Sequence, residues 1–230
     1  MLADNLKSID QRLFLRLAEM SDGEEDDYEK LRIRQLATLI TSSLETIIEQ
    51  ADKQMSEDAE LVQGLLRKMA LDNGEFELPV PPAQLAALRE AIAAANPPLD
   101  EGFVGTVKAY MKKSDDDGLT GMVDVLRILL QVFAAERLRA LTSTQLQADE
   151  GMQSVLSAVL DATPSQWDAV LREKLLSDDA TCTAEDFSGL LQDKMGEVVL
   201  GMPAGSGVQT VLAEYLSEMI SCARAIASEE

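Results

Sequence analysis

Apolar side chains recur at spacings of three and four residues along almost the whole chain, and this repeat constrains the fold more than any other feature. The first stripe consists of Leu2, Leu6, Ile9, Leu13, Leu17 and Met20. Residues at this spacing share one face of an α-helix. Aromatic residues make up only 4% of the sequence, whereas sheets are enriched in aromatic and β-branched side chains. The sequence therefore predicts an all-α fold with no sheet.

Glycines, prolines and capping residues divide these repeats into about ten helices. An acidic run with a glycine at 21–28 separates the first helix from a second that reaches Met55. Ser56 is a suitable N-cap for a separate third helix. Two later pairs have the spacing of a capping box, Thr163 with Gln166 and Thr183 with Asp186. We expect helical hairpins arranged as a bundle, and we find no fixed period that would indicate a solenoid.

The segment at residues 75–82 is the one part of the chain that we expect to be extended. Three of its last four residues are proline, which excludes a central strand and favours a polyproline II backbone. Phe76, Leu78 and Val80 alternate along it, so one side of this proline-rich strap can lie across the helices. The strap either seals the core or docks onto a partner, and the sequence favours sealing.

The domain organisation has two interpretations. Residues 1–230 can form a single all-helical domain, since this length is within the range of one domain. The polar stretch at 114–118 is the best internal boundary, because it combines three aspartates with Gly118. It would separate an N-terminal lobe, 1–113, from a C-terminal lobe, 119–230.

The chain contains no histidine, and this excludes many kinds of catalytic and metal site. Ser-His-Asp and Cys-His nucleophile systems, histidine-ligated zinc, Glu-x-x-His di-iron sites and haem bound by histidine all require that side chain. Any catalysis would depend on carboxylates, lysine, tyrosine or cysteine. We predict no catalytic residues, no metal site and no cofactor, and the sequence favours a protein that is not an enzyme.

Three short motifs resemble known ligand-binding loops but lack an essential residue. Residues 113–124 resemble a calcium loop, but Lys113 stands where the first acidic ligand is required. The glycine-rich turn 201–207 lacks the lysine of a phosphate-binding loop. The paired aspartates at 26–27, 116–117 and 178–179 lack the third aspartate, three residues on, that helical prenyl-transferring enzymes use to bind magnesium. We interpret these segments as turns and helix ends.

The formal net charge is −21, and it is nearly equal in the two halves of the chain. This argues against nucleic acid and anionic membrane surfaces as partners, because both are bound by clustered lysine and arginine. No apolar stretch is long enough to span a membrane. Cys182 and Cys222 form no Cys-x-x-Cys pair, which is typical of a reducing compartment. The start of the chain does not resemble a signal peptide. We expect the cytoplasm or, after removal of a transit peptide, the chloroplast stroma or mitochondrial matrix.

The sequence predicts a non-catalytic, acidic, helical protein-interaction module. An adaptor, an assembly or stability factor and a peripheral subunit are all compatible with it, and its partners would be proteins, including proteins with basic surfaces. The candidate contact residues are the acidic run Glu24, Glu25, Asp26 and Asp27, and the apolar strap residues Phe76, Leu78 and Val80. For the acidic run, the sequence favours the simpler interpretation that it is the solvated start of a helix.

The alternative is a histidine-free helical enzyme or a small-ligand binder, with a carboxylate or lysine site between helices. It predicts a pocket of several hundred Å³ in which polar side chains converge. The first side chains to inspect are Lys108, Tyr110, Arg127, Arg137 and Arg139, although each can be an outward-facing residue of an amphipathic helix.

Overall fold

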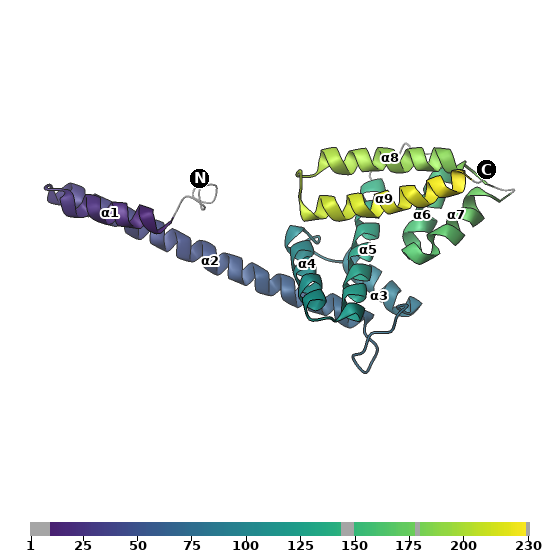
Figure 1. The fold of residues 1–230 in the computed structure, drawn as a ribbon, viewed down its shortest axis with the longest axis horizontal. Helices are drawn as coiled ribbons and strands as arrows, with labels where there is room; N and C mark the ends of the chain where they lie inside the picture. The colour runs from purple at the N-terminus through teal and green to yellow at the C-terminus, as the bar shows by residue number, and fades with distance from the viewer. Residues whose placement is uncertain (1–9, 144–149, 178–179, 229–230) are drawn as a thin grey trace. The chain divides into compact units, whose positions relative to one another are not determined.

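The computed structural model describes residues 10–143, 150–177 and 180–228. Within these ranges the regular elements are all helices and no strand occurs, which confirms the all-α class (Figure 1). The α-helices are α1 (Gln11–Gly23), α2 (Asp27–Met69), α3 (Pro82–Ala93), α4 (Glu101–Asp116), α5 (Thr120–Ser143), α6 (Glu150–Asp161), α7 (Trp167–Leu175), α8 (Ala184–Gly201) and α9 (Gly207–Ala227). A short 3₁₀ turn, η2 (Pro164–Gln166), precedes α7.

Local capping explains where several helices begin. Asp10 accepts hydrogen bonds from the first amides of α1, and the Asp26 carboxylate accepts one from the Tyr28 amide at the start of α2. The two predicted capping boxes, Thr163 with Gln166 and Thr183 with Asp186, are both present. These starts were predictable because capping depends on residues only three positions apart.

The predicted helix start at Ser56 is wrong, because α2 continues through it for 43 residues in total. No glycine or proline occurs between Asp27 and Gln63, so nothing forces the backbone out of the helix. The chain nevertheless divides into two compact units at this position, one ending at Ser56 and the other beginning at Glu57. The single-domain interpretation and the lobe boundary near 114–118 stay predictions.

In the first unit, α1 and the beginning of α2 are joined by the three residues 24–26. The Arg34 side chain, on α2, donates a hydrogen bond to the Ser21 hydroxyl of α1 over 3.3 Å. Leu17 and Ser21 are the buried residues of α1. Many other apolar side chains of this unit are partly or fully exposed.

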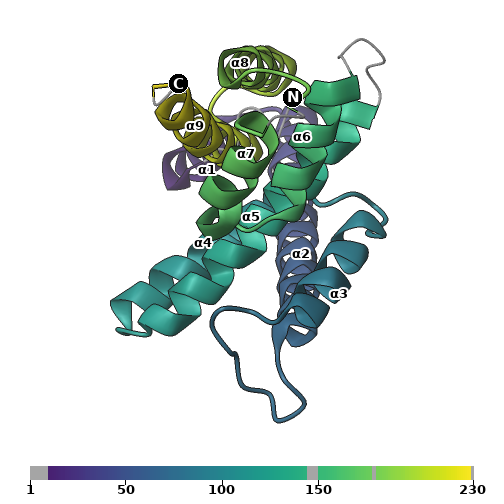
Figure 2. The same ribbon diagram turned by 90° about the vertical axis from the view of Figure 1, so that its right-hand side faces the viewer.

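The second unit has an apolar core formed by the end of α2 and by helices α3 to α9. α4 packs against α5, and α8 packs against α9 (Figures 1 and 2). Phe103 of α4 and Phe133 of α5 contact each other with their ring centroids 5.2 Å apart. None of the described helices is long and apolar enough to cross a lipid bilayer.

Candidate functional site

Exposed large apolar side chains are concentrated in the first unit. More than half of those in the described residues lie between 10 and 56, and they are Leu15, Met20, Tyr28, Leu31, Leu36, Leu39, Ile48 and Met55. Scattered single exposed hydrophobic residues are ordinary on a protein surface, but a concentration of them marks an interaction surface. The first unit is therefore one candidate functional region.

One helix face in this region is apolar over three turns. This 44–55 face of α2 consists of Leu44, Ile47, Ile48, Ala51 and Met55, whose spacings place them on one side of the helix. The Ile48 side chain is 58% exposed and that of Met55 is 68% exposed. Glu45 and Asp52 lie three and four residues from Ile48, so two carboxylates lie along one edge of the face.

The predicted acidic contact residues have local roles at the start of α2. The Glu24 carboxylate accepts hydrogen bonds from the amides of Glu25 and Asp26, over 3.0 and 3.3 Å. Asp26 caps the helix through the Tyr28 amide at 2.9 Å, and Asp27 is the first helical residue. Contact of this run with a partner stays a prediction.

The predicted strap residues lie in the irregular connection between α2 and α3, and they differ in how deeply they are buried. Val80 is buried at 6% exposure, and Phe76 is half-buried against the core of the second unit. Leu78 is 42% exposed. Leu78 is therefore the most exposed of the three. A docking role for the strap stays a prediction.

A pocket of about 390 Å³ lies in the second unit, between α4, α5 and α9. Its volume is within the range of small-molecule sites. Four apolar side chains line it, namely Met111, Leu130, Ala134 and Val211. Six polar side chains also line it, namely Lys108, Arg127, Gln131, Glu214, Tyr215 and Glu218. This is the kind of pocket that the small-ligand alternative predicts.

The cationic and anionic residues of the α4–α5–α9 pocket come from different helices. Lys108 and Arg127 come from α4 and α5, whereas Glu214 and Glu218 lie one turn apart on α9. The Arg127 guanidinium pairs with Asp124 at 2.6 Å in a largely exposed contact. No ion pair joins α9 to the cationic side of the pocket within the described residues.

Tyr215 is the most buried polar residue of the α4–α5–α9 pocket, at 4% exposure. Its ring meets Trp167 edge to face, with centroids 5.0 Å apart. Burial raises the pKa of Tyr215 well above its usual value, and the Arg89 guanidinium opposes this shift only in part. The phenol is therefore neutral at physiological pH and can both donate and accept a hydrogen bond.

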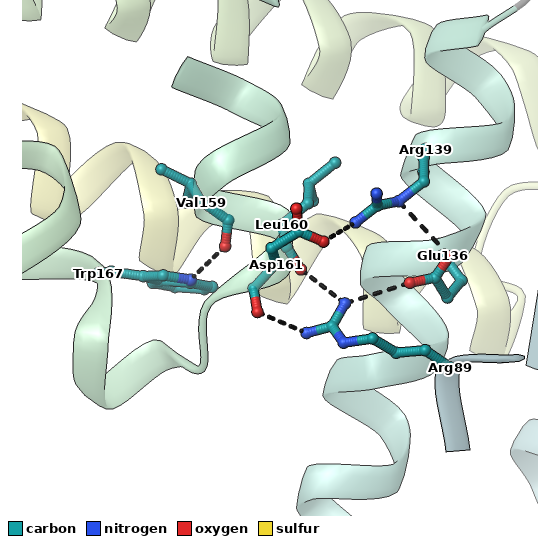
Figure 3. Close-up of polar contacts among 7 residues, drawn as sticks. All are labelled: Arg89, Glu136, Arg139, Val159, Leu160, Asp161 and Trp167. Atoms are coloured by element: carbon teal, nitrogen blue, oxygen red, sulfur yellow. Dashed lines mark hydrogen bonds and ion pairs between the residues drawn. The ribbon is translucent and has the colours of Figure 1, made fainter. Parts of the chain in front are cut away.

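Figure 3 shows a separate polar network that joins α3, α5 and the end of α6. The Arg89 guanidinium, on α3, donates to the backbone carbonyls of Leu160 and Asp161 over 2.8 and 3.0 Å, and it contacts Glu136 at 3.1 Å. Arg139 pairs with the Asp161 carboxylate at 2.7 Å. Arg89 thus satisfies the last carbonyls of α6, which have no partner within their own helix. This network is structural.

The residues singled out for the ligand-binding alternative therefore have different positions. Lys108 and Arg127 line the α4–α5–α9 pocket, and Arg139 belongs to the structural network. Arg137 is half-buried beside a smaller hollow of about 170 Å³. Tyr110 is half-buried against the core. The sequence missed Glu214, Tyr215 and Glu218, since nothing in it indicates that α9 packs beside α4 and α5.

The glycine-rich turn before α9 holds a carboxylate of the chain itself. Glu101 of α4 accepts hydrogen bonds from the amides of Gly207 and Val208, over 2.6 and 3.1 Å. A Cβ atom at Gly207 would lie 2.7 Å from the Glu101 carboxylate, so glycine is required for this close approach. The positive end of α9 is thus already neutralised from within the molecule.

Within the described residues, no cluster of three or more cysteine, aspartate or glutamate side chains is arranged to hold a metal ion. Comparison with protein-family models, curated proteins and solved structures finds no match to the chain. The chemistry of the two candidate regions is therefore the basis for inferring function.

Proposed function

We propose that this protein is a non-catalytic helical interaction module that binds a basic, amphipathic helix of a partner protein through the 44–55 face of α2. The observation that carries the proposal is the exposure of Ile48 and Met55 on one side of that helix. An adaptor, an assembly or stability factor and a peripheral complex subunit would all use such a surface.

The geometry of the 44–55 face supports a helical partner. Its apolar residues recur at spacings of three and four over about three turns, and such a row packs well against a second helix. Ile48 is 58% exposed and Met55 is 68% exposed, so burying the exposed part of each side chain would contribute about 1–2 kcal/mol. Residues of this size at the centre of an interface can provide most of its affinity.

Charge supports a basic partner. Glu45 and Asp52 lie along one edge of the apolar row, and the whole chain carries a net charge of −21. A partner helix with lysine or arginine beside its own apolar row would meet these carboxylates at the edge of the interface. Such edge charges mainly increase the association rate and the choice of partner, and salt weakens their effect.

The experiment is affinity isolation of the tagged chain from its native cells, at moderate salt, with the wild type and two variants compared side by side. The test variant is Ile48→Glu/Met55→Glu, which places two charges on the face without disturbing a buried site. Leu200→Glu is the matched control, because Leu200 is 89% exposed on α8 in the other unit. Circular dichroism verifies that all three proteins are equally helical.

We expect a stoichiometric partner that wild type and the Leu200→Glu control retain and the double variant loses. Its affinity should fall by at least about thirtyfold in the double variant, because about 2 kcal/mol or more of apolar burial is removed. Higher salt should weaken the wild-type complex. A chain that is reproducibly isolated alone, or a partner retained equally by all three proteins, would refute the proposal. If the partner is a second copy of the chain, light scattering will show a dimer that the double variant lacks, and the basic external helix would be wrong.

Three further expectations belong to this proposal. We propose that residues 75–82 act as a strap that seals the core of the second unit, as the burial of Val80 supports. We propose that the helices of that unit form a bundle of hairpins. We also propose a reducing intracellular compartment, since the sequence contains only two cysteines, Cys182 and Cys222, and they form no Cys-x-x-Cys pair.

A second candidate function is the binding of a small ligand in the α4–α5–α9 pocket. The observation that favours it is the convergence of charged and neutral polar side chains over an apolar lining. The two functions involve different units of the chain, so variants of one region do not test the other.

A further inference from the structure

Tyr215 is a buried residue whose hydroxyl the fold itself does not use. The residue is 4% exposed and lines the α4–α5–α9 pocket. Its hydroxyl is accessible to solvent and forms no hydrogen bond within the part of the chain that the structure describes. The neighbouring Trp167, by contrast, donates its indole N–H to the Val159 carbonyl over 3.1 Å. Buried tyrosine and tryptophan side chains normally have such a partner. A ligand in the pocket would supply it for Tyr215.

Two walls of the pocket present opposite charges that are not neutralised across it. Lys108 of α4 is half-buried and forms no ion pair within the described residues. Glu214 and Glu218 lie one turn apart on α9 and are both exposed, and neither carboxylate has a partner among those residues. A single charged group on a ligand would satisfy one wall and leave the other unpaired. A ligand with an anionic and a cationic end would satisfy both.

The rest of the lining suits an apolar body between the two charged ends. Leu130, Ala134 and Val211 offer only hydrocarbon, and the flexible Met111 side chain can adapt to the shape of a ligand. The Gln131 amide adds one neutral donor and acceptor beside them. The volume of about 390 Å³ admits a small organic molecule.

We propose that the α4–α5–α9 pocket binds a small zwitterion with an apolar body, whose carboxylate meets Lys108 and whose ammonium group meets Glu214 and Glu218. The Tyr215 hydroxyl hydrogen-bonds the same ligand. This inference gives the ligand class for the second candidate function and rests on it, and it is independent of the partner-binding face in the first unit.

The test is isothermal titration calorimetry of the whole protein with probes that differ in their charged ends and in the distance between them. The zwitterionic probes are 4-aminobutyrate, 6-aminohexanoate and 8-aminooctanoate, which vary the distance between the two charges. Octanoate and octylammonium are the matched single-charge probes. We expect one of the zwitterions to bind wild type at least about tenfold more tightly than either single-charge probe, since each charge-assisted hydrogen bond contributes about 1.5–3 kcal/mol.

Variants assign the two ends. Lys108→Met should weaken binding of the zwitterion and of octanoate by about tenfold and leave octylammonium unchanged. Glu214→Gln/Glu218→Gln should have the opposite pattern. Lys112→Met is the control, because Lys112 lies one turn further along α4, is exposed and does not line the pocket.

Three results would overturn the proposal that the pocket binds a zwitterion. Octylammonium that binds as tightly as the zwitterions and is unaffected by Lys108→Met would show a cation site instead. Equal binding of every probe to wild type and to both pocket variants would place binding elsewhere. Absence of heat with every probe, in a protein whose circular dichroism and unfolding are normal, would show that the pocket does not recognise this class. If the zwitterion binds and the 44–55 face proves inert, only the partner-binding proposal fails.

Discussion

Removing the Arg89 guanidinium should destabilise the second unit more than removing any exposed arginine. In the folded protein this group makes three polar contacts, to Glu136 and to the carbonyls of Leu160 and Asp161, between 2.8 and 3.1 Å. The Arg89 and Glu136 side chains are only 18% and 12% exposed. Arg89→Met keeps the apolar stem but leaves the carbonyls unpaired.

The magnitude follows from these contacts. Hydrogen bonds that involve a charged group contribute about 1.5–3 kcal/mol each, and breaking a buried ion pair costs about 3–5 kcal/mol. Arg139 remains 3.5 Å from the Glu136 carboxylate in the variant and reduces the loss. We therefore expect the free energy of unfolding to fall by about 3 kcal/mol. For a unit of this size, Tm should fall by about 6–12 °C.

Trp167 fluorescence is the appropriate assay, because this side chain is the only tryptophan and is 1% exposed in the second unit. Urea unfolding that is followed through it reports this unit alone. Arg127→Met is the matched control, because Arg127 and its partner Asp124 are 55% and 50% exposed. Its loss should cost less than about 0.5 kcal/mol, as for other exposed pairs.

A double variant distinguishes loss of a network from loss of a single contact. In Arg89→Met/Glu136→Met the carboxylate that lost its main partner is also removed. The double variant should therefore be more stable than the sum of the two single changes predicts, by about 1–3 kcal/mol. If Arg89→Met costs no more than Arg127→Met, or if the two single effects simply add, the network does not stabilise the fold as we argue.

Three further outcomes are expected. Burial raises the pKa of Tyr215, so above about pH 10 the unfolded state binds fewer protons than the folded state. The free energy of unfolding should therefore fall with rising pH in that range. Tyr215→Phe should remove this part of the pH dependence in urea titrations. Burial, and secondarily the Asp168 carboxylate, raise the pKa of the Cys222 thiol. Its alkylation by iodoacetamide at about pH 8, monitored by mass spectrometry, should therefore be slower than that of free cysteine. The reaction should be faster in Asp168→Asn. Glu101→Gln should lower stability by about 1 kcal/mol, measured by Trp167 fluorescence, because it removes the negative charge at the start of α9.

The helices could be predicted from the sequence where their signals are local. The capping pair at Thr163 and Gln166 and the one at Thr183 and Asp186 involve residues only three positions apart, and the structure contains both. The helix start predicted at Ser56 was wrong because serine, although favoured at an N-cap, is also tolerated inside a helix when nothing interrupts the backbone. The unit boundary at that position depends on which residues pack together, and helix propensity carries no information about that packing.

The candidate pocket was predictable only in part, and the reason is again distance along the chain. Lys108 and Arg127 belong to neighbouring helices joined by a short turn, so helix periodicity alone drew attention to both. Tyr215 lies more than eighty residues further on, in a helix whose own pattern indicates only that one face is buried. Its position beside α4 and α5 depends on long-range packing, which no local spacing encodes.

The carboxylates that make up the large negative charge fall into two groups, according to whether or not they cap a helix. Asp10, Asp26 and Asp100 cap helices by accepting backbone amides, and Glu101 does the same for a helix distant in sequence. These charges stabilise helix starts and cost little to retain, so they give no evidence of a partner. The argument for a basic or cationic ligand rests instead on carboxylates without such a role, which are those beside the 44–55 face and those of α9 in the pocket. Net charge alone would have counted both groups equally, and only their hydrogen bonds distinguish them.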